Sequence, residues 1–126
     1  MSKLETLEAL TEESFSVAPV PDARLVFKGV IAMRDPSGIV GGYLKRVHAA
    51  AVADQLQRVT LDVTALEFMN SSAIRLFIDW VEWIGTGTHQ YQLHCLTNAR
   101  VTWQRSTFNA LRSLSSQVTV EAKAAS

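Results

Sequence analysis

The chain has 126 residues, of which 48% are hydrophobic and 19% are charged. This composition is typical of one globular domain with a buried core and excludes a disordered chain. Twelve basic residues balance twelve acidic ones, so the formal net charge is zero, which argues against a general binder of nucleic acid or of anionic membranes. The acidic N-terminus does not resemble a signal peptide, no apolar run approaches the roughly 20 residues of a membrane span, and the single cysteine cannot form an internal disulfide. We therefore expect a small cytoplasmic domain.

The beginning of the chain is expected to form a tail and two strands. Residues 1–13 are polar, with leucines at every third position, and predict a loose tail or a short helix. Residues 14–20 and 23–32 have the composition of strands, and Pro21 and Asp22 predict the turn between them. These two strands should form an antiparallel hairpin at one edge of a sheet.

Helices and strands alternate in the rest of the chain. Helices are expected over residues 39–55, 71–84 and 100–114, and strands over residues 58–66, 91–98 and 117–122. Alternation of this kind is typical of βαβ units, in which the strands are parallel. We therefore predict an α/β fold over residues 14–122, with a mixed, mostly parallel sheet of about four to six strands, about three main helices packed on it, and a short tail over residues 123–126. Gly41 and Gly42 cost about 1 kcal/mol each in a helix interior, so they predict close packing there or a later helix start.

A polar triplet, Asn70-Ser71-Ser72, joins a predicted buried strand to the second helix. Because the first N–H groups of a helix lack intrahelical partners, Asn70 or Ser71 can serve as the N-cap. A helix N-terminus also carries partial positive charge and can hold a phosphate. A serine at the carboxyl end of a parallel strand is accessible to a kinase, and phosphorylation would add about −1.5 to −2 charges without breaking the core. The triplet by itself leaves both interpretations open.

The second helix is apolar over an unusually wide arc. At about 100° per residue, its core-facing residues are Ala73, Ile74, Phe77, Ile78, Val81 and Ile84. Arg75 and Asp79 lie on the opposite side with the i,i+4 spacing of an ion pair. Leu76, Trp80 and Trp83 form a further apolar stripe. Either a neighbouring helix covers this stripe, or it is an aromatic docking surface.

The stretch VTLDVTALEFMNSSAIRLFIDWV resembles the signature of STAS domains, the anti-sigma factor antagonist family. In that signature, an apolar-Asp-apolar-Ser/Thr strand precedes an apolar-Asp-Ser-Ser-Gly segment that opens a helix. The element order also matches, so the resemblance covers residues 14–122. It implies that a partner serine kinase phosphorylates Ser71, with Ser72 as the second choice, and that a cognate phosphatase removes the phosphate. Asp62 corresponds to the acidic residue of the strand.

Two residues depart from the family pattern. Asn70 replaces the usual Asp, which removes a negative charge beside the acceptor serine, and Ala73 replaces the usual Gly, which favours the helix. These departures indicate a divergent bacterial branch of the family.

The resemblance implies a non-enzymatic, protein-binding regulator of a bacterial partner-switching pathway. While Ser71 is unmodified, the partner, a serine kinase or an anti-sigma-like protein, would dock on a surface made of Asn70, Ser71, Ser72, Arg75, Leu76, Trp80 and Trp83. Phosphorylation of Ser71 would oppose docking. No cofactor is expected, since ATP would bind to the kinase. The alternative is an unphosphorylated scaffold that dimerises or docks through the stripe of Leu76, Trp80 and Trp83.

Enzymatic chemistry is not indicated. His48, His89 and His94 lack the spacing of a metal site, and Cys95 lies on a predicted buried strand as an inert thiol. Ser71 is not part of a G-x-S-x-G nucleophile motif, and the GTGT segment lacks the lysine of a phosphate-binding loop.

Overall fold

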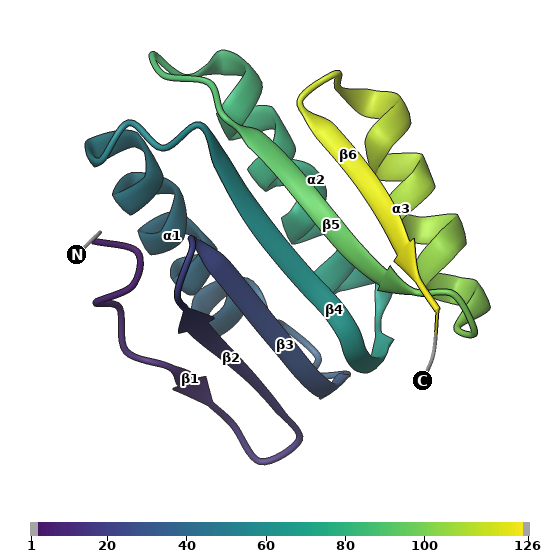
Figure 1. Ribbon diagram of the computed structural model, residues 1–126. Coiled ribbons are helices and arrows are strands. Elements are labelled where there is room, and N and C mark those ends of the chain that lie inside the picture. Colours follow the sequence, from purple (N-terminus) through teal and green to yellow (C-terminus); the bar gives the residue numbers. More distant parts are fainter. Residues whose placement is uncertain (1–2, 125–126) are drawn as a thin grey trace.

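The computed structural model describes residues 3–124, which fold around a six-stranded sheet (Figure 1). The strands are β1 (Leu10–Thr11), β2 (Phe15–Val20), β3 (Arg24–Ile31), β4 (Arg58–Met69), β5 (Gln92–Asn98) and β6 (Val118–Lys123). They lie side by side in sequence order. The pairs β1–β2 and β2–β3 are antiparallel, whereas β3–β4, β4–β5 and β5–β6 are parallel. The predicted edge hairpin and the mixed, mostly parallel sheet are therefore confirmed.

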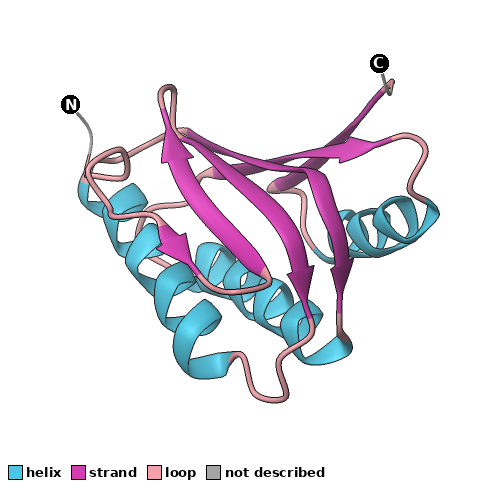
Figure 2. Cartoon of the chain, turned by 90° about the horizontal axis from the view of Figure 1, so that it is seen from below, coloured by secondary structure: helices cyan, strands magenta, loops and turns pink. Residues whose placement is uncertain are grey.

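The helices all lie on one face of the sheet, and the other face is open (Figures 1 and 2). They are a short π-helix, η1 (Ser37–Gly41), followed directly by α1 (Gly42–Ala53), then α2 (Ser71–Thr86) and α3 (Thr102–Leu114). Right-handed crossovers that add each parallel strand on the same side of the previous one place every connecting helix on the same face. Within residues 3–124, no helix is long and apolar enough to cross a membrane.

The N-terminal segment differs from the prediction of a loose tail or short helix. It forms turns and then the two-residue strand β1, and Leu4 is fully buried in the core. Leu7 and Leu10 pack against the same core. The Tyr43 hydroxyl also donates a hydrogen bond to the Glu8 carbonyl oxygen, at 2.9 Å. The regular spacing of the leucines thus reflects repeated anchoring of an irregular segment to the core.

Gly41 and Gly42 lie where η1 meets α1, and both a late start of the α-helix and close packing account for them. The α-helix begins late, at Gly42, and a Cβ atom at Gly41 would lie only 3.3 Å from a methyl carbon of Leu76 on α2. This close approach brings η1 and α1 against α2. Because α2 also contacts α3, it is the central helix of the layer and is buried on more than one side.

A buried glutamine closes a gap between two strands. Pairing of β4 with β5 stops at Asp62, and beyond it the backbone of β4 needs other partners. The Gln104 side chain of α3, fully buried, donates hydrogen bonds to the carbonyl oxygens of Val63, at 2.7 Å, and Leu66, at 2.8 Å. It also accepts one from the Asn98 N–H, at 2.7 Å. These bonds satisfy buried backbone groups and fix α3 against the carboxyl half of β4.

Candidate functional site

Ser71 and Ser72 are the first two residues of α2, at the edge of the sheet where β4 ends, and both are exposed. The Asn70 side-chain oxygen accepts a hydrogen bond from the Ala73 N–H, at 2.9 Å, so Asn70 is the N-cap. Within residues 3–124, neither serine hydroxyl has a hydrogen-bond partner. The capping function thus belongs to Asn70 and not to the exposed Ser71.

The amide of Asn70 has a second contact that an aspartate could not make. Its nitrogen donates to the Met33 carbonyl oxygen, at 2.9 Å, while its backbone N–H donates to the Ile31 carbonyl oxygen, also at 2.9 Å. Asn70 therefore joins the start of α2 to the segment that follows β3. Ala73, the other departure from the family pattern, is fully buried, and its methyl group fills core volume that a glycine would leave empty.

The substitution Asn70→Asp is expected to lower the free energy of unfolding by about 1 kcal/mol, although it preserves the cap. The aspartate gains from the helix dipole, but it loses the donor to Met33 and places a carboxylate oxygen against a carbonyl oxygen. Urea unfolding at pH 7 measures the change. Ser72→Asp is the matched control, because it adds the same charge two residues further along the chain and leaves the cap intact. If Asn70→Asp were as stable as the parent, the amide donor would not explain this residue.

A shallow groove lies between the first turns of α2 and the segment that leads into η1. It is lined by Asp35, Pro36, Ser37, Ser71, Ser72, Ile74, Arg75, Leu76, Ile78 and Asp79. The Asp35 carboxylate accepts hydrogen bonds from the Ser37 N–H, at 3.2 Å, and hydroxyl, at 2.6 Å, and these bonds lower the pKa of Asp35. On the other wall, Arg75 Nε lies 3.4 Å from Asp79 Oδ1, which confirms the predicted i,i+4 pair. Both serines thus lie at the rim of a groove that has a positive and a negative group on the α2 side.

The accessible apolar surface of α2 faces α3. Ile74 and Ile78, predicted to face the core, are only partly buried. They also line a second, mostly apolar groove with Ser106, Thr107, Ala110, Leu111 and Leu114. Because both grooves share these two isoleucines, an apolar track runs from the serines along the α2–α3 side of the molecule.

The stripe of Leu76, Trp80 and Trp83 is not a docking surface, which corrects one of the two predictions made for it. Leu76 is 8% exposed and Trp80 is 0% exposed, while Trp83 is partly buried. Leu76 packs at Gly41, and the Trp83 ring lies 6.0 Å from the His48 ring of α1. The other prediction, that a neighbouring helix covers the stripe, is confirmed. This burial leaves almost no surface of Leu76 and Trp80 accessible to a partner or a second copy of the chain.

Trp80 is part of a hydrogen-bonded network in the second half of α2, nine residues beyond Ser71. Its indole N–H donates to the Tyr91 hydroxyl oxygen, at 2.8 Å, and the Tyr91 hydroxyl shares a hydrogen bond of 2.7 Å with His48 Nδ1. Burial raises the pKa of Tyr91 and lowers the pKa of His48, so both side chains are neutral near pH 7. This network joins α1, α2 and the start of β5 and stabilises the fold.

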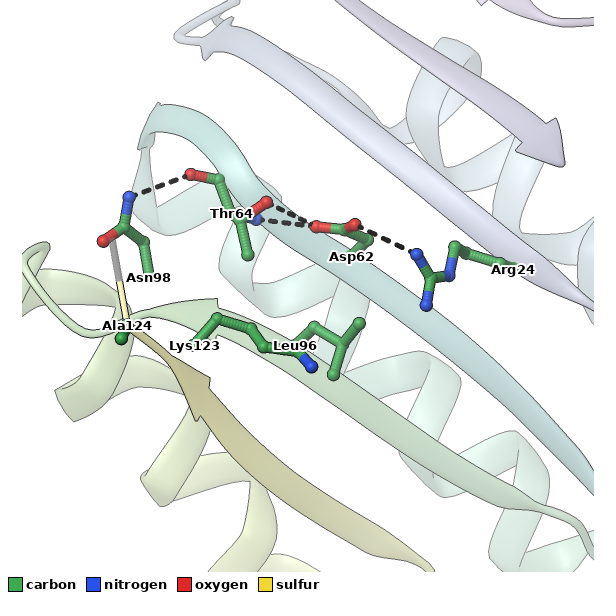
Figure 3. A pocket seen from close by; sticks show the side chains of 7 residues that line it. All are labelled: Arg24, Asp62, Thr64, Leu96, Asn98, Lys123 and Ala124. Carbon is green, nitrogen blue, oxygen red and sulfur yellow. Dashed lines mark hydrogen bonds and ion pairs between the residues drawn. The ribbon is translucent and has the colours of Figure 1, made fainter. Parts of the chain in front are cut away.

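Asp62 lies on the open face of the sheet (Figure 3). Its Oδ1 accepts hydrogen bonds from the Thr64 N–H, at 3.0 Å, and hydroxyl, at 2.7 Å, and its Oδ2 lies 3.8 Å from Arg24. The pairing of β4 with β3 shifts register just after Asp62. At this irregular point of the strand, the carboxylate supplies the acceptor for the backbone N–H and the hydroxyl of Thr64. Eight residues of strand at about 3.3 Å each separate Asp62 from Asn70. The aspartate therefore supports the strand and does not meet Ser71.

A polar hollow surrounds Asp62 on the open face. It is lined by Arg24, Asp62, Thr64, Leu96, Asn98, Lys123 and Ala124 (Figure 3). Asn98 donates to the Thr64 carbonyl oxygen, at 3.3 Å, so the polar groups of the hollow largely satisfy one another. The sheet thus has mixed charges here and no apolar docking patch.

His48 and His89 both lie beside the Tyr91 ring, with ring centroids 5.7 and 6.5 Å from it, and Cys95 is buried in the core. His89 Nε2 is 2.6 Å from the Leu56 carbonyl oxygen, and His94 contacts Thr119 and Glu121 on β6. Within residues 3–124, no group of three or more His, Cys, Asp or Glu side chains is arranged to hold a metal ion. Burial raises the pKa of the Cys95 thiol to about 12, so the thiol is protonated and unreactive near pH 7.

Comparison with known proteins identifies the fold. No protein-family model and no curated protein sequence matches this chain. One similar solved structure is a chain in the crystal structure of the diguanylate cyclase SiaD in complex with its activator SiaC from Pseudomonas aeruginosa, with a TM-score of 0.67 and 17% identity over 90% of this chain and 95% of that chain. Another is an anti-sigma factor antagonist from Mycobacterium paratuberculosis, with a TM-score of 0.54 and 18% identity over 86% of this chain and 88% of that chain. The predicted anti-sigma factor antagonist (STAS) fold is confirmed.

Proposed function

We propose that this chain, which has the fold of the anti-sigma factor antagonists, is a non-enzymatic regulator in a bacterial partner-switching pathway. In its unmodified form it binds a serine kinase or anti-sigma-like protein in the cytoplasm, and phosphorylation of Ser71 by that kinase ends the binding. A cognate phosphatase restores the unmodified form. ATP belongs to the kinase, and the chain itself holds no cofactor.

The observation that carries this proposal is the separation of cap and hydroxyl at the start of α2. Asn70 caps the helix, so Ser71 is exposed and its hydroxyl has no structural bond to lose on modification. A phosphate at this first helical position would be stabilised by the helix dipole and by unpaired N–H groups. The domain can therefore accept the modification without unfolding, which a reversible switch requires. Ser72, also exposed, is the second choice of acceptor.

The docking surface follows from what is accessible around Ser71. Of the residues predicted to contact the partner, Ser71, Ser72 and Arg75 line the groove together with the mostly buried Leu76, and Asn70 shapes it. Ile74 and Ile78 supply the accessible apolar surface that Trp80 does not, and Trp83 is not among the residues that line the groove. An apolar segment of the partner would cover the isoleucines, while a phosphate of about −1.5 to −2 charges at the rim would oppose desolvation of that surface.

The names of two proteins with similar folds support a regulatory function for this chain. One similar structure is named an anti-sigma factor antagonist, and another holds an enzyme together with its activator. An antagonist and an activator each act on another protein. For this chain, the same class of function is a proposal that rests on Ser71 and its surroundings.

Affinity capture from the native cells tests the proposal. Unphosphorylated parent protein and Ser71→Ala should capture the same partner, whereas Ser71→Asp should capture at least about 10-fold less of it, because it adds charge at the rim. Ser116→Asp, an exposed serine in the turn before β6, is the control for added charge elsewhere. Equal capture by Ser71→Ala and Ser71→Asp would contradict a switch at this residue.

A further inference from the structure

Three residues spaced by four lie along one side of α2 and line the same groove: Ser71, Arg75 and Asp79. Residues with this spacing are neighbours on a helix surface. Arg75 is thus flanked by a serine one turn toward the N-terminus and by an aspartate one turn toward the C-terminus. Its side chain is 73% exposed and can reach either of them.

The existing pair of Arg75 with Asp79 is weak. It consists of one contact of 3.4 Å between Arg75 Nε and Asp79 Oδ1. It also has the less favourable orientation, since an acidic residue stabilises a helix more when it precedes its basic partner by four residues than when it follows it. An arginine that makes one exposed contact of this kind exchanges partners readily.

Phosphorylation of Ser71 would supply a stronger partner in the favourable orientation. A phosphoserine carries about two negative charges and three acceptor oxygens, and an arginine binds such a group through two parallel hydrogen bonds. The first turn of α2 contains no acidic residue, and the Asp35 carboxylate on the facing wall of the groove already accepts hydrogen bonds from the Ser37 N–H and hydroxyl. Asn70, which replaces the usual aspartate, keeps the start of α2 free of negative charge until Ser71 is modified.

We infer that Arg75 is the residue that responds to phosphorylation: it leaves Asp79 and pairs with phosphoserine 71. This inference rests on Ser71 being the phosphorylated residue, as proposed above. The two partners lie eight residues apart, about 12 Å along the helix axis, so the Arg75 side chain reorients between them while its backbone stays in place. The Asp79 carboxylate then loses its cation beside Ile78, so one modification changes the charge at both ends of the rim. Arg75 is a positioning residue that fixes the phosphate and releases Asp79.

The test uses protein that carries phosphoserine at position 71 by site-specific incorporation, so that no kinase is needed. Titration followed by ³¹P NMR gives the second pKa of the phosphate, which is ordinarily about 6. We expect this pKa to be about 0.5 units lower in the parent chain than in Arg75→Gln, because the guanidinium favours the dianion. It should be lower still in Asp79→Asn, in which no carboxylate competes for Arg75. Arg100→Gln, which removes an exposed arginine from the loop before α3, should leave it unchanged.

Equal phosphate pKa values in the parent chain and in Arg75→Gln would overturn the inference. The Nε resonance of Arg75 gives a second readout, since it should shift on incorporation of phosphoserine in the parent chain and in Asp79→Asn. An unshifted resonance would likewise contradict the exchange. Neither result depends on whether cells phosphorylate Ser71, so failure of the exchange and failure of the proposed function are distinguishable.

Discussion

Replacement of Trp80 by alanine is expected to lower the free energy of unfolding by about 3–5 kcal/mol, the range for removal of a fully buried tryptophan. Trp80 is 0% exposed, its ring packs 6.2 Å from that of Phe77, and its indole N–H is bonded to Tyr91. Alanine would leave a cavity in the centre of the helix layer and remove the first bond of the network that reaches His48. A domain of this size is stable by only about 5–15 kcal/mol, so the variant should unfold at a much lower urea concentration.

Trp83→Ala is the matched control for this substitution. It removes the same side chain from the same helix, but at a partly buried position beside α1. The expected loss is about 1–2 kcal/mol, because less apolar area leaves water there. Urea unfolding compares the two variants, and sedimentation gives their mass. A Trp80→Ala protein that keeps its stability but changes its oligomeric state would instead support an interface at this tryptophan.

The substitution Ile78→Arg is expected to weaken binding of the captured partner by about 10-fold or more, which is typical for loss of an apolar residue at the centre of an interface. Ile78 is partly buried and lines both grooves beside α2. An arginine there can extend its charged end into water, so stability should change by less than the affinity does. Binding of purified partner by isothermal titration calorimetry, together with urea unfolding, separates the two effects.

Thr86→Arg is the control for a charge on α2 outside the grooves. Thr86 is exposed at the last position of the helix, where a basic residue suits the helix dipole. The Thr86→Arg variant should bind the partner with the affinity of the parent chain. If Ile78→Arg also bound with parent affinity, the apolar track along α2 and α3 would not be the docking surface.

The order of elements could be predicted because turn residues and apolar periodicity agree along most of the chain. The apolar periodicity of a helix does not show how many other helices pack against it. The apolar arc of α2 is too wide for one helix packed on one sheet, and this width alone does not distinguish a surface position for Trp80 from a position under a neighbouring helix. Since α2 lies between α1 and α3, residues on its flanks are buried as well, and its partly exposed apolar residues are Ile74 and Ile78 beside the grooves and Trp83 beside α1.

The partners of two polar side chains, Gln104 and Asn70, could not be predicted from the sequence. Gln104 lies on the same side of its helix as Phe108 and Leu111, and a glutamine among apolar residues was a sign that buried carbonyl groups needed a donor. For Asn70, the missing charge was visible in the sequence, but the donor to Met33 depends on a loop 37 residues away in the chain. Both contacts are long-range, so no local pattern contains them.

Phosphopeptide mass spectrometry on the protein from its native cells tests the switch most directly. Trypsin should release residues 59–75 as one peptide, which contains Thr60, Thr64, Ser71 and Ser72. The proposed switch predicts a phosphate on Ser71 in a fraction of the molecules that changes with growth conditions. Recovery of this peptide without phosphate across those conditions, or with phosphate only on another residue, would contradict it.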